Sequence, residues 1–432
     1  MNPAILLFIL FVVALFLHLP IGYALGFSAI VTLLSLGLYD PSFIIQTYYS
    51  AASSFTLLAI PFFILAGDIM LYGGISDKLV GLGRALFGHS KGALGIITVF
   101  SCMIFAALSG SGPATTAAIG GILIPAMVEE GYDEGFAATL TATSGALGPI
   151  IPPSIPFVMY GITCQVSIAD MFAAGMIPGV MMGLILMVYC KLACKKYHFG
   201  VPAPKKTGRE KLLALKDAFW AILAPVIILG GIYGGIFTPT EAAIIACVYS
   251  LFVGAFVYKK IKIKDLFVIV SRSALTTGTC LILLGGATLF GRILSGERVP
   301  TMLASALLSI SDNKVVILLL ITLMLFITGM FMETIAAILI LSPLLLSVVK
   351  QFDVTPLHFG VILCTNLVVG LCTPPVGVNL FVASRKAGIG LEKMFRWLVP
   401  AVGCLMAVVL LITFCPAIVE IGPNFVHWLQ SK

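Results

Sequence analysis

Residues 101–127 read SCMIFAALSGSGPATTAAIGGILIPAM. The stretch is long enough to cross a bilayer as one helix, because about 20 apolar residues suffice. Its centre, from Ser109 to Thr116, holds two glycines and a proline, which weaken or break a helix. Backbone that leaves the helix inside a membrane must be covered by protein or line a polar cavity. We therefore expect two half-helices that meet at a polar tip, and transporters bind ions and substrates at such tips.

The composition is that of a membrane protein with many spans. Of the 432 residues, 60% are hydrophobic and 10% are charged, against about 25% charged in soluble proteins. Apolar runs of spanning length recur along the chain, which predicts an all-α polytopic membrane protein. The basic residues lie between these runs, so a nucleic-acid-binding face is not indicated. The ten cysteines include no CxxC motif, so neither a zinc knuckle nor a disulfide framework is expected.

The positive charges predict a topology. Suppose that the N-terminus is outside and that both interrupted stretches fold back as re-entrant hairpins. Then 20 of the 25 Lys and Arg residues fall in four inner loops, at 78–91, 190–217, 259–272 and 385–396. If either stretch crossed the bilayer as one helix, every later loop would change sides and the positive-inside bias would be lost. The charge pattern therefore favours hairpins, with both termini on the outer side.

The two halves of the chain carry similar blocks in the same order. Three pairs match at nearly constant offsets: 113–126 with 332–345, 141–157 with 363–379, and, more weakly, 53–72 with 277–296. In the third pair Gly67 aligns with Gly291. In the predicted topology the first copy starts outside and the second inside, which makes the repeat inverted. Inverted repeats place binding sites near the middle of the bilayer, where the two copies meet.

These blocks give the expected domain boundaries. The first inverted repeat is 1–189, a basic cytoplasmic linker is 190–217, and the second inverted repeat is 218–432. Within the repeats we expect scaffold helices at 3–52 and 218–272, hairpins at 95–127 and 315–349, Pro-broken helices at 136–161 and 358–384, and a final span at 396–418.

Each half thus supplies one hairpin tip and one Pro-Pro break. The breaks carry hydroxyls, amides and freed carbonyls, and such oxygens suit a small hard cation such as Na⁺. Half-helix N-termini suit an anion such as a carboxylate. Neither tip contains Lys or Arg, so we expect helix ends, hydroxyls and bound cations, rather than a buried guanidinium, to hold an anion. The spans hold no chain of acids and histidines, which favours Na⁺ coupling over a proton relay.

Three acids lie near apolar surroundings, where acidic residues are functional candidates. Glu241 follows Thr238 at the spacing of a capping box, with Pro239 at the first helical position, and we expect a helix cap. Asp68 lies at the end of a span, and we expect an interfacial residue. Glu333 lies beside the second tip, where a functional and a structural role stay equally open. The histidines lie at run ends and in loops, and none is assigned as a ligand.

Four motifs resemble a known family: SGSGPATTAAIG (109–120), IIPPSIPFVMYG (150–161), LLAIPFFILAGDIM (57–70) and CTPPVGVNLFVAS (372–384). They look like the large membrane subunit of tripartite ATP-independent periplasmic (TRAP) transporters, and the similarity covers essentially the whole chain. The sialic-acid type resembles this chain more than the C4-dicarboxylate type does.

The resemblance implies an elevator-type transporter in a bacterial inner membrane, with periplasmic termini. It also implies two partners, a small membrane subunit on a separate chain and a periplasmic substrate-binding protein, and import of an organic acid driven by a Na⁺ gradient. Two Na⁺ sites would lie beside the tips. Carried over by motif, the first would use Ser109, Gly110, Ser111 and Gly145, and the second Gly329, Gly370 and Thr373. On the substrate side we expect Thr115, Thr116, Ser154 and Asn379.

Three alternatives remain at this point. A stand-alone carrier for dicarboxylates or another anion would share the repeat but need no partner. An intramembrane enzyme would need a catalytic dyad or metal set, and no HExxH, GxSxG or paired-Asp arrangement occurs. A channel could use paired re-entrant loops, but mirrored Pro-broken helices fit alternating access better.

Overall fold

The computed structural model describes residues 3–200 and 204–431, and within these ranges the chain is helical and contains no strand. Eight of the described helices are long and apolar enough to cross a membrane. The predicted all-α polytopic fold is thereby confirmed.

The helices of the first half and the short turn between them are α1 (Pro3–Phe16), α2 (Ile21–Ser35), α3 (Pro41–Ala52), the 3₁₀ turn Phe55–Leu58, α4 (Ala59–Tyr72), α5 (Ile75–Phe87), α6 (Ala93–Ser109), α7 (Gly112–Glu129), α8 (Glu134–Gly145), α9 (Ile155–Cys164) and α10 (Ile168–Tyr197). Those of the second half are α11 (Gly208–Tyr233), α12 (Pro239–Phe252) with the π turn Val253–Val257, α13 (Ile263–Gly296), α14 (Val299–Ile310), α15 (Lys314–Phe331), α16 (Thr334–Val349), the 3₁₀ turn Lys350–Phe352, α17 (Pro356–Gly370), α18 (Val378–Ala387), α19 (Glu392–Phe414) and α20 (Pro416–Gln430).

The order of elements from α4 to α10 recurs from α13 to α19. In each series a long helix leads to a shorter one (α5 or α14), then to a helix pair (α6–α7 or α15–α16). A helix broken at a Pro-Pro pair follows (α8–α9 or α17–α18), and a long helix ends the series (α10 or α19). Gly and Pro end α8 and α17 at the breaks because neither residue supports a continuing helix.

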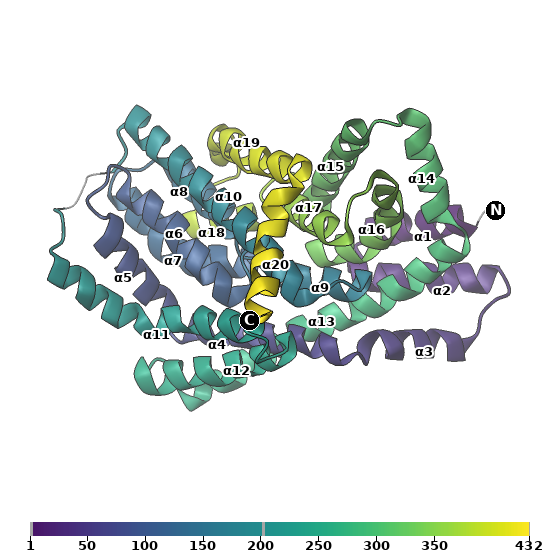
Figure 1. Ribbon diagram of the computed structural model, residues 1–432, viewed down its shortest axis with the longest axis horizontal. Helices are drawn as coiled ribbons and strands as arrows, with labels where there is room; N and C mark the ends of the chain where they lie inside the picture. The colour runs from purple at the N-terminus through teal and green to yellow at the C-terminus, as the bar shows by residue number, and fades with distance from the viewer. Residues whose placement is uncertain (1–2, 201–203, 432) are drawn as a thin grey trace.

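Helices of the two halves pack against each other where the halves meet. α2 of the first half packs along α13 of the second, and α12 of the second half packs along α4 of the first. Figure 1 shows α3, α4, α11, α12 and α13 in the lower row of the molecule, with the helix pairs and broken helices above them. We call α2, α3, α4, α11, α12 and α13 the frame, and α6–α9 with α15–α18 the hairpin layer.

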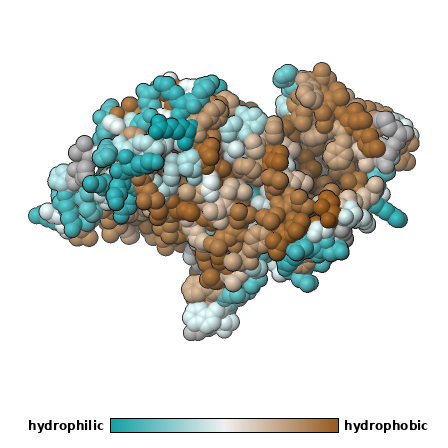
Figure 2. Space-filling model, turned by 90° about the horizontal axis from the view of Figure 1, so that it is seen from above, coloured by the Kyte–Doolittle hydropathy of each residue, from teal (hydrophilic) through white to brown (hydrophobic). Residues whose placement is uncertain are grey.

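Two helices of the hairpin layer, α8 and α17, are almost entirely buried. Every residue of α8 from Gly135 to Gly145 is buried, and so is every residue of α17 from His358 to Gly370. The outer surface is largely apolar in its middle, and hydrophilic side chains gather at the left-hand end in Figure 2. At that end α10 finishes and α11 begins (Figure 1). The basic residues of 190–217 belong to this hydrophilic end.

Several segments differ from the sequence-based expectation. The stretch expected as a basic loop at 78–91 is largely the amphipathic helix α5. Most of the expected linker 190–217 is helical, because α10 continues to Tyr197 and a capping box between Thr207 and Glu210 starts α11. The final span is followed by another helix, α20, which turns away from α19 and runs across α10 (Figure 1).

The capping box predicted at the start of α12 is confirmed. Glu241 accepts hydrogen bonds from the backbone N–H and the hydroxyl of Thr238, at 2.8 and 2.9 Å. Glu241 is therefore a helix cap and takes no part in the site.

Candidate functional site

The tip of the first helix pair is held together by its own hydroxyl groups. Gly110 turns the chain between α6 and α7 with φ +58°, a conformation freely available to glycine. Ser109 Oγ lies 2.7 Å from Thr115 Oγ1, and Thr115 Oγ1 donates to the carbonyl oxygen of Ser111 at 2.8 Å. The predicted residues of this tip therefore form one hydrogen-bonded cluster.

The end of α8 lies directly on this tip, and two glycines permit the approach. A Cβ added at Gly145 would collide with Thr116 Oγ1 and lie 3.1 Å from the carbonyl oxygen of Gly112. A Cβ at Gly148 would lie 2.5 Å from the carbonyl oxygen of Ser111. The structure thus brings Gly145 and Thr116 to the first tip.

The second half reaches the same tip through Asn379 on α18. This side chain is fully buried, and its Nδ2 donates to the carbonyl oxygen of Ala142 on α8 at 3.2 Å. A Cβ at Gly112 would lie 3.0 Å from Asn379 Oδ1. Among the described residues Oδ1 has no hydrogen-bond partner. A buried oxygen without a partner is costly, so a bound cation or donor would satisfy it.

A second close contact joins α15 to the break that follows α17. A Cβ at Gly329 would lie 2.7 Å from the carbonyl oxygen of Leu367, and one at Gly370 would lie 2.7 Å from that of Gly329. Thr373 lies in the same break, where its hydroxyl donates to a carbonyl of α17 at 3.0 Å. One turn before Gly370, the fully buried Asn366 has an Oδ1 without a described partner. Asn366 was not among the predicted ion ligands, although an amide inside an apolar run is a signal for one.

The two tips differ in the helix that follows each. The Glu333 carboxylate accepts hydrogen bonds from the N–H groups of Ile335 and Ala336, at 2.9 and 3.1 Å, and so caps α16. At the start of α7, Ser111 makes no such side-chain cap, and Pro113 occupies the first turn. Of the two roles left open for Glu333, the structure shows the structural one, a helix cap. Of the two tips, only the second has a carboxylate that caps the helix following it.

Ser154 has its hydrogen-bonding capacity engaged inside the protein. It precedes α9, its Oγ accepts from the N–H of Phe157 at 3.3 Å and donates to the carbonyl oxygen of Pro149, and the residue is fully buried. Ser154 therefore acts as a helix cap. It lies beside the first tip, since a Cβ at Gly110 would lie 2.9 Å from the carbonyl oxygen of the preceding residue, Pro153. These hydrogen bonds favour a structural role, and its predicted contact with substrate stays a prediction.

Two neighbouring cavities lie between the hairpin layer and the frame. The larger has a volume of about 740 Å³, and its lining includes Tyr23, Ser111, Thr279, Glu333 and Leu371. The smaller has a volume of about 270 Å³, and its lining includes Asp68, Ser109, Ser111, Arg272 and Val382. Both include Ser111 and Thr276, so the first tip and the frame helix α13 border both cavities.

Asp68 corrects the expectation of an interfacial residue. It is only 9% exposed, its Oδ1 lies 3.5 Å from Arg272 Nε, and its Oδ2 accepts a hydrogen bond from Ser273 at 2.7 Å. The preceding residue, Gly67, touches the first tip, since a Cβ there would lie 3.3 Å from Ser109 Cα. The sequence could not reveal this cluster because α4 and α13 meet only in the folded chain.

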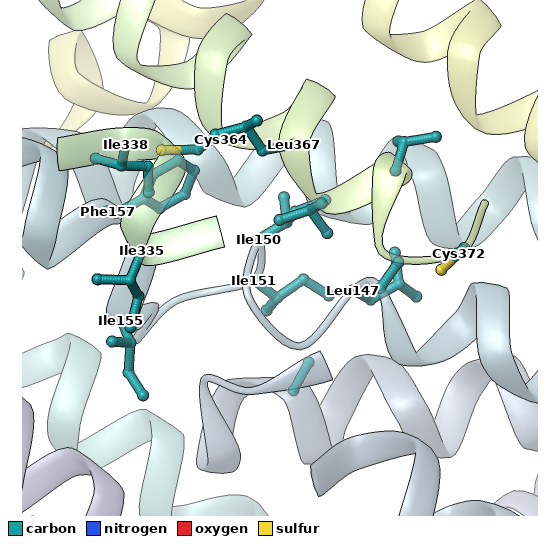
Figure 3. Close-up of a cluster of buried hydrophobic side chains, with 14 of the residues drawn as sticks. Leu147, Ile150, Ile151, Ile155, Phe157, Ile335, Ile338, Cys364, Leu367 and Cys372 are labelled. Atoms are coloured by element: carbon teal, nitrogen blue, oxygen red, sulfur yellow. The ribbon is translucent and has the colours of Figure 1, made fainter. Parts of the chain in front are cut away.

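Apolar packing surrounds the polar groups of the breaks, and Ile155 and Ile335 of this packing also line the larger cavity. Figure 3 shows Leu147, Ile150 and Ile151 in the break between α8 and α9, with Ile150 drawn nearest to Leu367 of α17, and Ile335 of α16 above Ile155 of α9. All six side chains belong to one buried hydrophobic cluster. The polar groups of the two breaks therefore lie next to a tightly packed hydrophobic core.

Comparison with known proteins identifies the architecture. Residues 8–418 match the family model described as the tripartite ATP-independent periplasmic transporter, DctM component. The isethionate TRAP transporter permease protein DctMQ of Oleidesulfovibrio alaskensis is 43% identical over 96% of this chain, which spans 66% of that relative's own length. The sialic acid TRAP transporter large permease protein SiaM of Vibrio cholerae is 38% identical over 95% of this chain and 96% of the relative.

The C4-dicarboxylate TRAP transporter large permease protein DctM of Pseudomonas aeruginosa is 39% identical over 93% of this chain and 94% of the relative. Among solved structures, the YdaH transporter of Alcanivorax borkumensis superposes with a TM-score of 0.65 over 96% of this chain and 98% of that chain. At 15% identity, that likeness concerns the fold alone. The chain belongs to the DctM family, the large permease component of TRAP transporters.

Proposed function

We propose that this TRAP large permease imports a small organic anion by Na⁺-coupled alternating access, with the anion and the ions held between its two tips. The observation that carries the proposal is that both hairpin tips, the start of α9 and the break after α17 line cavities facing the frame. The unpartnered buried oxygens of Asn366 and Asn379 beside these tips support cation binding, because a small hard cation prefers oxygen ligands.

The proposed ion ligands remain those carried over from the family motifs. Ser109, Gly110, Ser111 and Gly145 would serve one Na⁺, and Gly329, Gly370 and Thr373 the other. Thr115, Thr116 and Asn379 remain proposed for the substrate side.

The relatives support an anionic substrate class. Their names specify isethionate, sialic acid and C4-dicarboxylates, which carry a sulfonate or carboxylates. Identities of 38% and 39% do not separate the sialic-acid type from the C4-dicarboxylate type. We therefore propose a carboxylate or sulfonate of this size range, with sialic acid as one member.

The partners and the orientation follow from the same proposal. A separate small permease would cover part of the exposed apolar surface of the frame, and a periplasmic binding protein would deliver the acid. Both termini would be periplasmic in a bacterial inner membrane, with the basic end of the molecule in the cytoplasm. Transport would proceed by movement of the hairpin layer against the frame, as in elevator-type transporters.

An uptake panel tests the proposal. Cells that lack their own uptake systems would express this chain with its small subunit and binding protein, and would receive labelled isethionate, succinate or N-acetylneuraminate. We expect one acid to accumulate only when all three proteins are present. Full uptake by this chain alone in liposomes would instead establish the stand-alone carrier, and no uptake of any acid would overturn the proposed substrate class.

A further inference from the structure

Arg272 brings a positive charge to the first tip from outside the hairpin layer. Its side chain is 50% exposed and lines the smaller cavity together with Ser109 and Ser111. Asp68 lies 3.5 Å from Nε. The described part of the chain offers the two terminal nitrogens no hydrogen bond or ion pair. Since a guanidinium carries five N–H donors, most of this group is free to meet a ligand.

Among the described residues, no other Lys or Arg lines either cavity. Two described acids line the cavities, Asp68 and Glu333, and both already have interaction partners within the protein. Asp68 faces Arg272 and Ser273, and Glu333 accepts two backbone N–H groups of α16. Arg272 is therefore the one side chain along the described linings that combines a full positive charge with unused donors.

The first tip adds a second attraction for an anion at the same place. At the start of α7 the Ser111 side chain accepts no hydrogen bond from the first N–H groups of the helix. The start of α16 is closed by Glu333. A helix N-terminus with open N–H groups favours negative charge. Of the two tips, the first tip, beside Arg272, is therefore the one that favours binding of an anionic group.

We propose that Arg272, oriented by Asp68 and Ser273, binds the carboxylate or sulfonate of the transported anion beside Ser109 and Ser111. This inference rests on the proposed function. Arg–carboxylate pairs form charge-assisted and often bidentate hydrogen bonds. Asp68 contacts the guanidinium of Arg272 at Nε. The two terminal nitrogens therefore keep their N–H donors for a ligand, while Asp68 sets the orientation of the group. The frame thereby contributes a specificity-determining residue to a site otherwise built from the hairpin layer.

Equilibrium binding to the purified complex of large and small subunits tests this role. The probe is whichever of isethionate, succinate and N-acetylneuraminate the wild type transports, titrated calorimetrically without the binding protein. We expect Arg272→Gln to weaken binding about tenfold or more, the loss typical of a hydrogen bond to a charged group. Arg272→Lys should recover part of the affinity, because it restores the charge but not the fork of donors.

Arg292 provides the matched control. It lies on the same helix α13, donates to Thr47 at 3.1 Å and lines neither cavity. Arg292→Gln should leave the affinity within about twofold of the wild type. If Arg272→Gln fails to fold, the double variant Asp68→Asn/Arg272→Gln removes both charges together and avoids a lone buried carboxylate.

The outcomes separate this inference from the proposed function. Wild-type affinity in a folded Arg272→Gln or double variant would show that the pair only fastens α13 to α4, and would overturn the inference while transport stands. Absence of transport by the wild-type complex would instead overturn the proposed function.

Discussion

At the scale of single residues, the site depends on positions where no side chain fits. Gly145 brings the end of α8 against Thr116 and Gly112 at the first tip, closer than any Cβ would permit. Gly329 and Gly370 permit an equally close approach between α15 and the end of α17 at the second tip. Such contacts bring backbone carbonyl oxygens close to these glycines, and in the proposal those oxygens face a small ion. Even one added methyl group would therefore move the oxygens that the proposal assigns to Na⁺.

Gly145→Ala should raise the Na⁺ concentration for half-maximal uptake about tenfold, because overpacking of about 1–3 kcal/mol would displace the tip. Uptake measured against external Na⁺ checks this. Gly121→Ala on α7 is the control, since its Cβ would meet only the Lys386 side chain, at 3.7 Å. Unchanged Na⁺ dependence at normal membrane abundance would remove Gly145 from the ion site.

Ser154 should matter for stability and not for substrate affinity. Because its hydroxyl caps α9, Ser154→Ala should lower the free energy of unfolding by about 1 kcal/mol and leave KM unchanged. Thermal unfolding of the purified complex and uptake kinetics check the two halves of this prediction, with Ser154→Thr as the variant that keeps a cap. A raised KM without loss of stability would restore the predicted substrate contact.

At the scale of elements, local chemistry was predictable and tertiary pairing was not. The breaks after α8 and α17 follow from Gly and Pro themselves, and so does the tip at Gly110. α5 was missed because its charged residues, such as Lys78 and Arg84, resemble a loop until their helical spacing is considered. The ion pair of Asp68 with Arg272 joins α4 to α13, and no periodicity in either segment indicates it.

The frame contacts the two tips unequally. Gly67 on α4 lies against Ser109 of the first tip, whereas its repeat-related residue, Gly291 on α13, has no atom within 4 Å of an added Cβ. If the halves exchange roles during alternating access, a second state would bring the second tip to Gly291. The structure described here would then be one of two related arrangements.

Bulky substitutions at the two glycines should therefore have opposite conformational effects. Gly67→Leu should disfavour the present state and Gly291→Leu the alternative one, and both should reduce uptake. A cysteine introduced at Ala117, which lines the smaller cavity, reports the state through its labelling by a membrane-impermeant maleimide. We expect Gly67→Leu to lower this labelling about tenfold and Gly291→Leu to preserve it. Gly278→Leu, also with open space at its Cβ, is the control, and equal labelling in all variants would argue against exchange.

At the scale of the whole molecule, charge and hydropathy orient the chain. The hydrophilic end in Figure 2 is the end where α10 finishes and α11 begins, and the basic linker lies there. The positive-inside bias predicts that this end lies in the cytoplasm. The C-terminal helix α20 packs mainly on α10 and has few contacts with α19 (Figure 1), and the prediction keeps its end periplasmic.

Cysteine labelling in intact cells checks the orientation. In a Cys415→Ser background, since Cys415 is exposed, Lys206→Cys should react with an impermeant reagent only after the cells are opened. Gln430→Cys should react in intact cells. The reverse pattern would place the linker outside and contradict the predicted topology.

The central claim is that a Na⁺ gradient moves an organic anion through the site between the two tips. Its most direct test is accumulation of the transported acid in liposomes that contain the large and small subunits, with binding protein outside. An inward Na⁺ gradient should drive the acid above its external concentration, and an equal K⁺ gradient should not. Accumulation driven equally by a pH gradient without Na⁺ would contradict the claim.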